Sequence, residues 1–199
     1  MSENSFEEAT EDRWKQALRQ AGWNGSIYHL WWESGGDQWK KIYRGPIRWE
    51  QIKSKAKRVG RDYLNDLVST IPEKSISLVG YSLGVRIIYY GMESWDSSKK
   101  VLKDAILLGG AVARDKSWGS KTSSLAGRVI NIYNSEDQTL SWWYKTGELY
   151  RNNPCGLKPI KEQHHKIINV DVTSLIGTSS HSDKHYLGVL PQTAGKLLW

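Results

Sequence analysis

Three separate stretches of this chain carry side chains that can perform nucleophilic catalysis. In residues 80–84 (GYSLG), Ser82 has a glycine two residues before it and another two residues after it. An apolar run precedes this stretch, and helix-forming residues follow it. Residues 134–137 (NSED) supply carboxylates, and residues 181–185 (HSDKH) supply histidines. A serine hydroxyl becomes a nucleophile when a histidine takes its proton and a carboxylate orients that histidine. The chain therefore holds the parts of a serine nucleophile with a base and an acid.

The elements that must position these stretches follow from the hydrophobic pattern. Short, β-rich apolar runs predict strands at Ser26–Trp32, Ser75–Val79, Ala105–Leu108, Val129–Tyr133 and Ile167–Val172. Apolar residues at helical spacing predict helices at Trp14–Ala21, Trp49–Leu67, Leu83–Trp95, Thr139–Tyr150 and from about Tyr186. Continuously apolar strands that alternate with helices predict a single α/β domain over residues 1–199, with a small, mainly parallel sheet and helices on both faces.

The order of the three stretches carries more weight than any one of them. Each follows its own predicted strand, and the carboxyl ends of parallel strands meet at one edge of a sheet. A G-x-S-x-G turn between a strand and a helix, followed by an acid and then a histidine, is the order of the α/β-hydrolase triad. We expect Ser82 to be the nucleophile, the Leu83 N–H to stabilise the oxyanion, and Gly84 to be small so that helix and strand pack closely.

Each stretch alone also has an ordinary interpretation. Ser82 could lie in a buried turn, the acidic stretch suits a helix N-cap, and most histidines are surface or core residues. From the residues alone, Glu136 and Asp137 compete as the acid, and His181 and His185 compete as the base.

Composition narrows the protein class. A lone cysteine, Cys155, forms no disulfide within the chain and favours a reducing compartment. The apolar runs are too short to span a bilayer, and the acidic start is unlike a signal peptide, so we expect a cytoplasmic protein without a transmembrane segment. The net charge is +7, with lysines and arginines densest at residues 53–61; no nucleic-acid motif accompanies them, so we interpret them as a solvated helix face. Binding to anionic lipid or nucleic acid is the alternative that this charge suggests.

The chain resembles the α/β-hydrolase-like proteins of the domain family DUF726. The segments that carry the resemblance are AGWNGSIYHLWWES (21–34), LVGYSLGVRIIYY (78–90), AILLGGAV (105–112), GRVINIYNSEDQTL (127–140) and INVDVTSLIG (168–177) with a histidine after it. The resemblance implies Ser82 as nucleophile, Asp137 as acid because it heads an Asp-x-x-Leu step, and His181 as base. His185 stays the rival, because the family more often has a tyrosine after its His-x-Asp.

The chain also departs from the α/β-hydrolase pattern. The front strand expected before residue 12 is missing, so the second oxyanion donor has no candidate. Residues between the strands at 105 and 129 are too few for a large cap domain, which predicts an open site, lined by Trp118 and Trp142.

The function expected from the sequence is carboxylester or thioester hydrolysis by Ser82, Asp137 and His181. It requires no metal or organic cofactor, and the substrate would be a small ester or a lipid-like molecule. The alternative is a non-catalytic α/β-hydrolase scaffold that binds partners through a surface rich in tryptophan, since the chain has 11 tryptophans.

Overall fold

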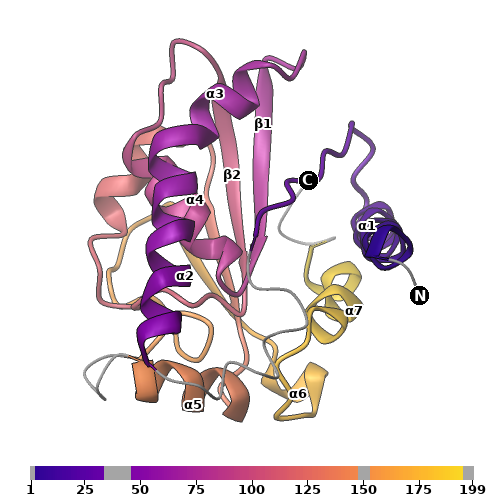
Figure 1. The fold of residues 1–199 in the computed structure, drawn as a ribbon, viewed down its shortest axis with the longest axis vertical. Coiled ribbons are helices and arrows are strands. Elements are labelled where there is room, and N and C mark those ends of the chain that lie inside the picture. The colour runs from indigo at the N-terminus through magenta and orange to yellow at the C-terminus, as the bar shows by residue number, and fades with distance from the viewer. Residues whose placement is uncertain (1–2, 34–45, 148–152, 195–199) are drawn as a thin grey trace. The chain divides into compact units, whose positions relative to one another are not determined.

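The computed structural model describes residues 3–33, 46–147 and 153–194 (Figure 1). The chain divides into two compact units, residues 34–181 and residues 1–33 together with 182–199. The prediction of one domain over residues 1–199 stays a prediction.

The larger unit is built on a four-stranded sheet. Its strands are β1 (Ser75–Tyr81), β2 (Val101–Leu108), β3 (Val129–Tyr133) and β4 (Ile167–Asp171), and they pair in the order β1-β2-β3-β4. All three pairings are parallel. The predicted parallel sheet is confirmed, and its four strands begin or end within a few residues of the predicted ones.

The helices of the larger unit follow the strands in the predicted alternation. They are α2 (Pro46–Arg58), the π-helical turn η2 (Val59–Tyr63), α3 (Leu64–Ser69), α4 (Gly84–Glu93), the 3-10 helix η3 (Gly119–Ser124), α5 (Gln138–Gly147) and α6 (Thr173–Ile176). In Figure 1, α2 and α4 lie side by side against the sheet, and both the helix pair and the α4–β1 pair are in contact. Between β2 and β3 the described chain holds only η3 and turns, so no large cap is present there. The predicted α/β fold is confirmed.

The core lies between α4 and the central strands. Residues 105–108 of β2 and 129–130 of β3 are fully buried, as expected for strands covered on both faces. Val85 and Ile88 of α4 pack into this core together with Leu107 and Val129. Burial of such side chains, at about 1.5–3 kcal/mol each, anchors α4 to the sheet directly after Ser82.

The helix predicted at Trp49–Leu67 exists, but a π-helical turn interrupts it. Gly60 in this turn lies against α4, where a Cβ atom would collide with the carbonyl oxygen of Ile87. The periodicity of apolar residues predicted the helix, whereas the extra residue in this turn arises from close contact with α4.

The strand predicted at Ser26–Trp32 is wrong: these residues belong to no strand. None of them is buried, and their aromatic rings contact one another and α1 (Glu3–Gln20). His29 stacks on Trp31 with ring centroids 4.4 Å apart and meets the edge of Trp14 at 6.4 Å. The β-rich composition gave an extended segment, but a strand also needs a hydrogen-bonded neighbour, which composition does not report.

The smaller unit contains α1 and α7 (Asp183–Ala194), which contact each other. Arg13 of α1 binds Asp183 at the start of α7, with 2.8 Å between Nη2 and Oδ2. The helix predicted from about Tyr186 is confirmed as α7, with a start three residues earlier.

Candidate active site

Ser82 occupies a strained turn between β1 and α4. Its φ is 53°, and it is the one non-glycine residue with a positive φ in the described parts of the chain. A non-glycine residue in this left-handed region costs about 1–3 kcal/mol, so neighbouring contacts must hold it there. The Ser82 N–H donates to the Leu108 carbonyl at 2.9 Å, and the Ala111 N–H donates to the Ser82 carbonyl at 3.0 Å. Both ends of the turn are thereby fixed to the chain that follows β2.

The glycine needed for close packing at this turn is Gly80 and not Gly84. A Cβ on Gly80 would lie 2.7 Å from Cδ1 of Ile88 and 3.0 Å from the Gly84 carbonyl carbon. A Cβ on Gly84 would meet no described atom within 4 Å. The prediction for Gly84 is therefore wrong, because the helix approaches the strand with the Gly84 backbone and its missing side chain faces open space.

Asp137 lies in the loop after β3, directly before α5, and its two carboxylate oxygens have separate partners. Oδ1 accepts a 2.8 Å hydrogen bond from the Leu140 N–H and so caps the N-terminus of α5. Oδ2 lies 2.6 Å from Nδ1 of His181. Asp137 is fully buried, while Glu136 is exposed. Asp137 therefore both caps α5 and contacts His181, so the helix-cap interpretation of this stretch does not exclude the interpretation as the acid.

His181 lies between Asp137 and Ser82. Its Nε2 is 2.8 Å from Ser82 Oγ, so the two ring nitrogens join the serine to the carboxylate. The His181 side chain is 12% exposed. Of the two candidate bases, the one beside Ser82 is thus His181; His185 belongs to α7 in the smaller unit.

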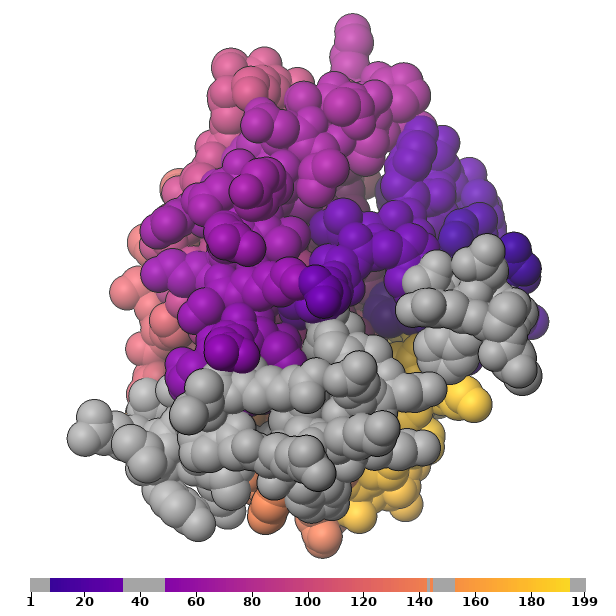
Figure 2. All heavy atoms as spheres, viewed as in Figure 1, coloured from indigo at the N-terminus to yellow at the C-terminus, as the bar shows by residue number. Residues whose placement is uncertain are grey.

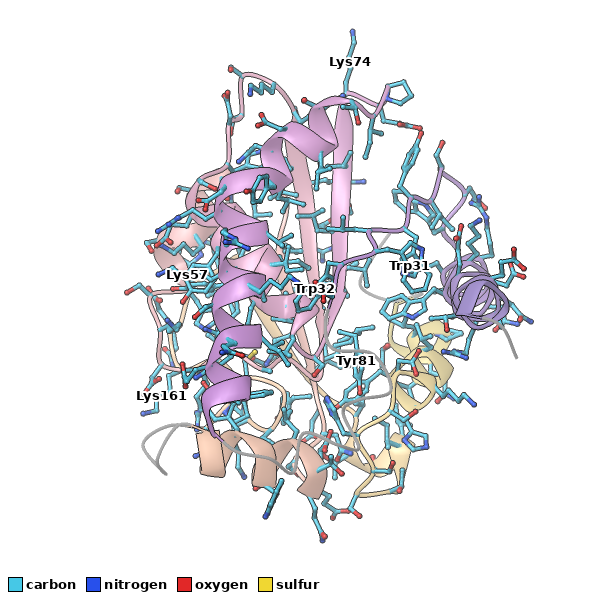
Figure 3. All side chains as sticks on the ribbon, in the orientation of Figure 1. Trp31, Trp32, Lys57, Lys74, Tyr81 and Lys161 are labelled. Carbon is cyan, nitrogen blue, oxygen red and sulfur yellow. The ribbon has the colours of Figure 1, made fainter. Side chains whose placement is uncertain are left out.

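Tyr81, the last residue of β1, covers one face of this histidine. The two rings stack with centroids 4.9 Å apart and planes inclined by 26°. Figure 3 shows the direction of β1, with Lys74 just before the strand at one end and Tyr81 at the other. The sequence pattern did not indicate this contact, because the stacking partner of Tyr81 lies far along the chain.

Asn134 joins the acid loop to the histidine loop and was also missed. It is fully buried, its Nδ2 donates to the Thr178 carbonyl at 2.9 Å, and its Oδ1 accepts from the Glu136 N–H at 3.0 Å. The Gln138 N–H also donates to the Ser179 carbonyl at 3.1 Å. An asparagine directly after a buried strand was the one signal in the sequence that could have indicated this role.

Leu83 is the N-terminal cap residue of α4, where its N–H faces away from the helix ladder. No hydrogen bond of the described chain uses this N–H. A carbonyl oxygen bound to Ser82 would meet the positive end of the α4 dipole as well. This is the arrangement expected of one oxyanion donor.

Trp118 and Trp142 were expected to line an open site, and Trp118 does not line it. Trp118 is fully buried in the core, where its Nε1 donates to the Ala113 carbonyl at 3.0 Å and its ring meets that of Tyr89. Trp142 of α5 is 48% exposed. Trp118 follows a lysine- and serine-rich stretch that reads as a surface loop, but the tryptophan itself fills the core beside β2.

A broad surface depression of about 700 Å³ lies elsewhere in the larger unit. Arg114 and the segment from Pro159 to Asn169 line it. None of Ser82, Asp137 and His181 contributes to its wall. We place the candidate chemistry at the strained serine and not in this depression.

Residues 45–190 match the family described as "Protein of unknown function (DUF726)". Relatives include an "Uncharacterized membrane protein" of Caenorhabditis elegans, 31% identical over 134 residues (64% of this chain, 22% of the relative). Another "Uncharacterized membrane protein", from Schizosaccharomyces pombe, is 29% identical over 133 residues (64% and 17%). A "Transmembrane and coiled-coil domain-containing protein" of Oryza sativa subsp. japonica is 27% identical over 113 residues (54% and 17%). No solved structure matches the chain.

The chain thus spans about a fifth of the length of these curated relatives. Within its described residues, no helix has the length and apolar character needed to cross a membrane. The expected cytoplasmic location stays a prediction. The same residues contain no group of three or more His, Cys, Asp and Glu side chains placed to hold a metal ion.

Proposed function

The chain belongs to the DUF726 family, and we propose that it is a serine hydrolase of the α/β-hydrolase type. The reaction is hydrolysis of a carboxylester or thioester. Ser82 is the nucleophile, His181 the general base and Asp137 the acid that orients the histidine. A small ester or a lipid-like molecule is the substrate class.

One observation carries this proposal: the series of short contacts from Asp137 through His181 to Ser82. The two distances, 2.6 Å and 2.8 Å, are those of strong hydrogen bonds. The serine at the end of the series holds the left-handed backbone conformation described above, which exposes its hydroxyl. A turn serine in a binding scaffold has no need of this strain or of two partners from distant strands.

In the first half of the reaction, Ser82 Oγ attacks the carbonyl carbon of the substrate while its proton passes to Nε2 of His181. The negative oxygen that forms is stabilised by the Leu83 N–H. Asp137 accepts a hydrogen bond from Nδ1 and stabilises the imidazolium form. His181 then gives its proton to the leaving alcohol or thiol, which departs and leaves an acyl group on Ser82.

In the second half, a water molecule takes the place of the leaving group. His181 removes a proton from this water, which attacks the acyl carbonyl. Collapse of the second tetrahedral intermediate returns the proton to Ser82 Oγ and releases the acid. The nucleophile, base and acid are all side chains, so the proposed reaction requires no metal ion or organic cofactor.

Hydrolysis of short p-nitrophenyl esters tests the proposal. We expect measurable turnover by the parent protein and a loss of about 10⁴-fold or more in kcat for Ser82→Ala. Ser123→Ala, which alters an exposed serine in η3, is the matched control and should hydrolyse at the parent rate. If Ser82→Ala and the parent hydrolyse these esters equally, the proposal of an enzyme is wrong and the non-catalytic scaffold takes its place.

A further inference from the structure

A group of positive side chains surrounds two buried tyrosine rings on α4. We call it the basic cluster; its members are Lys57, Arg86, Lys116 and Lys121, and its rings are Tyr89 and Tyr90. The four cations come from α2, α4, the loop after β2 and η3. All belong to the larger unit, and the proposed reaction uses none of them.

Three of the cations converge on the ring of Tyr90. The distances from its centroid are 5.1 Å to Lys57 Nζ, 5.4 Å to Lys116 Nζ and 5.7 Å to Arg86 Cζ. Lys116 Nζ also donates to the Tyr90 hydroxyl at 3.2 Å. Cation–π contacts of this kind hold flexible side chains in place at about 0.5–1 kcal/mol each, so positive charge is concentrated and partly ordered here.

The described carboxylates do not neutralise these three cations. Glu93 forms an ion pair with the fourth cation of the cluster, Lys121, with 2.9 Å between Nζ and Oε1. That bond is the largest cause of the lowered pKa of Glu93, to which the charges of Lys57 and Lys116 also contribute. In the described chain no carboxylate lies within 4 Å of the charged groups of Lys57, Lys116 or Arg86.

Tyr89 does not neutralise them either. Burial is the main cause that raises the pKa of Tyr89 to about 12, so this phenol stays uncharged at neutral pH. The rings therefore offer only their faces and hydroxyl groups to the cations. Positive charge remains in excess around Tyr90.

Arg86 is a buried cation whose guanidinium has few hydrogen-bond partners in the described chain. The residue is only 8% exposed, its Nη1 makes a long 3.4 Å hydrogen bond to the Ala111 carbonyl, and its buried Nε has no partner in the described chain. A buried charge without a counter-ion costs several kcal/mol. An anion that reaches the guanidinium and the neighbouring lysines would remove this cost.

We propose that the basic cluster binds a phosphate monoester. This group carries close to two negative charges at neutral pH and offers several acceptor oxygens, which matches one guanidinium fork and two ammonium groups better than a single carboxylate does. α2, to which Lys57 belongs, forms part of the face seen in Figure 2, and Lys57 and Lys116 are only half-buried, so the cluster is reachable from solvent. The proposal concerns binding and holds whether or not Ser82 is a nucleophile.

Two sources of the phosphate monoester can be separated by experiment. Glycerol phosphate, measured by titration calorimetry, represents a soluble ligand. Phosphatidylcholine vesicles that contain phosphatidic acid, measured by co-sedimentation, present the same group on a lipid surface. Phosphatidylserine vesicles carry negative charge on a diester and act as the charge control.

The test variant is Lys57→Gln combined with Lys116→Gln, which removes two charges and leaves the buried Arg86 in place. Its matched control, Lys74→Gln with Lys103→Gln, removes two charges from exposed lysines at the amino ends of β1 and β2. We expect the test variant to bind at least about tenfold more weakly and the control to bind like the parent. Loss on glycerol phosphate identifies a soluble source, and loss on phosphatidic acid vesicles alone identifies a lipid source.

Three results would overturn the proposal. One is the absence of parent binding to both glycerol phosphate and phosphatidic acid vesicles. Another is an equal loss of binding in the control variant, which would mean that net charge alone is responsible. The last is equal parent binding to phosphatidylserine and phosphatidic acid vesicles, which would mean that the monoester is not recognised.

Discussion

Asp137 illustrates how one side chain can serve the fold and the proposed chemistry together. Its Oδ1 caps α5 and its Oδ2 binds His181, so the helix holds the carboxylate in the orientation that the histidine requires. A carboxylate fixed in this way loses little freedom when the imidazolium forms. The neighbouring Glu136 is exposed and makes neither contact.

Replacing Asp137 with Asn should separate these two roles. Asparagine can still cap α5, so we expect a folded protein, but its amide favours the wrong tautomer of His181. Ester hydrolysis should fall by up to about 10⁴-fold in kcat. Glu136→Gln is the control and should leave kcat unchanged. A greater loss from Glu136→Gln than from Asp137→Asn would reverse the assignment.

The stacking of Tyr81 on His181 predicts that this ring positions the base. An aromatic pair contributes about 0.5–1.5 kcal/mol, so Tyr81→Leu should lower kcat by up to about tenfold while KM changes little. Tyr81→Phe retains the ring and should recover most of the rate. Equal rates in the Leu and Phe variants would remove the ring from the mechanism.

The thiol of Cys155 is predicted not to react in the native protein. It is fully buried beside Gly110, and burial raises the pKa of its thiol to about 12. A thiol reagent should leave the native protein unmodified at mildly alkaline pH and react once guanidinium chloride unfolds it. Cys155→Ser should also keep full esterase activity. Rapid reaction of the native thiol would contradict the burial described here.

Among the elements, the turn from β1 to α4 determines where the serine is held. The helix reaches the strand through its own backbone at Gly84, directly over Gly80. The Ser82 N–H donates to the Leu108 carbonyl and the Ala111 N–H donates to the Ser82 carbonyl, and these two hydrogen bonds fix the strained residue. The turn is thus supported by three consecutive elements: β1, α4 and the end of β2.

Gly80→Ala should destabilise the protein and Gly84→Ala should not. The new methyl group at residue 80 would overlap Ile88 and the Gly84 backbone, at a cost of about 1–3 kcal/mol in the free energy of unfolding. At residue 84, alanine meets open space and has a better helix propensity, so stability should be equal or slightly higher. Chemical denaturation of both variants measures the difference. Equal stability of the two would contradict this packing.

The strands that position Ser82, Asp137 and His181 could be predicted because each is a short, continuous apolar run. The segment Ser26–Trp32 could not, since its β-rich aromatics are equally suited to ring contacts with Trp14, and only a partner strand would decide. Periodicity likewise located the long helix but not its π-helical turn, which depends on Gly60 lying against α4. Local pattern predicts element type; close contacts between elements decide the details.

At the scale of the whole molecule, the sequence predicted which residues the parallel sheet brings together. In the sheet, Tyr81 pairs with Leu108 and Tyr133 pairs with Asp171, so the strand ends that carry the serine, acid and histidine lie at one edge. The order of the three motifs along the chain was sufficient to predict that these strand ends lie together. Two contacts were not predictable from the sequence. Asn134 hydrogen-bonds to a residue 44 positions away, and Tyr81 stacks on His181, which is 100 positions away.

The chain corresponds to about a fifth of the length of its curated relatives, whose names give no reaction, so the chemistry must be tested on this protein itself. The most direct measurement is labelling with a fluorophosphonate probe, followed by mass spectrometry of the modified peptide. A nucleophilic serine in a working triad is phosphonylated only while the protein is folded. We predict modification at Ser82 alone, lost on unfolding before exposure to the probe and absent in Ser82→Ala. A folded parent protein that remains unlabelled, or that is labelled at another serine, would contradict the assignment of Ser82 as the nucleophile.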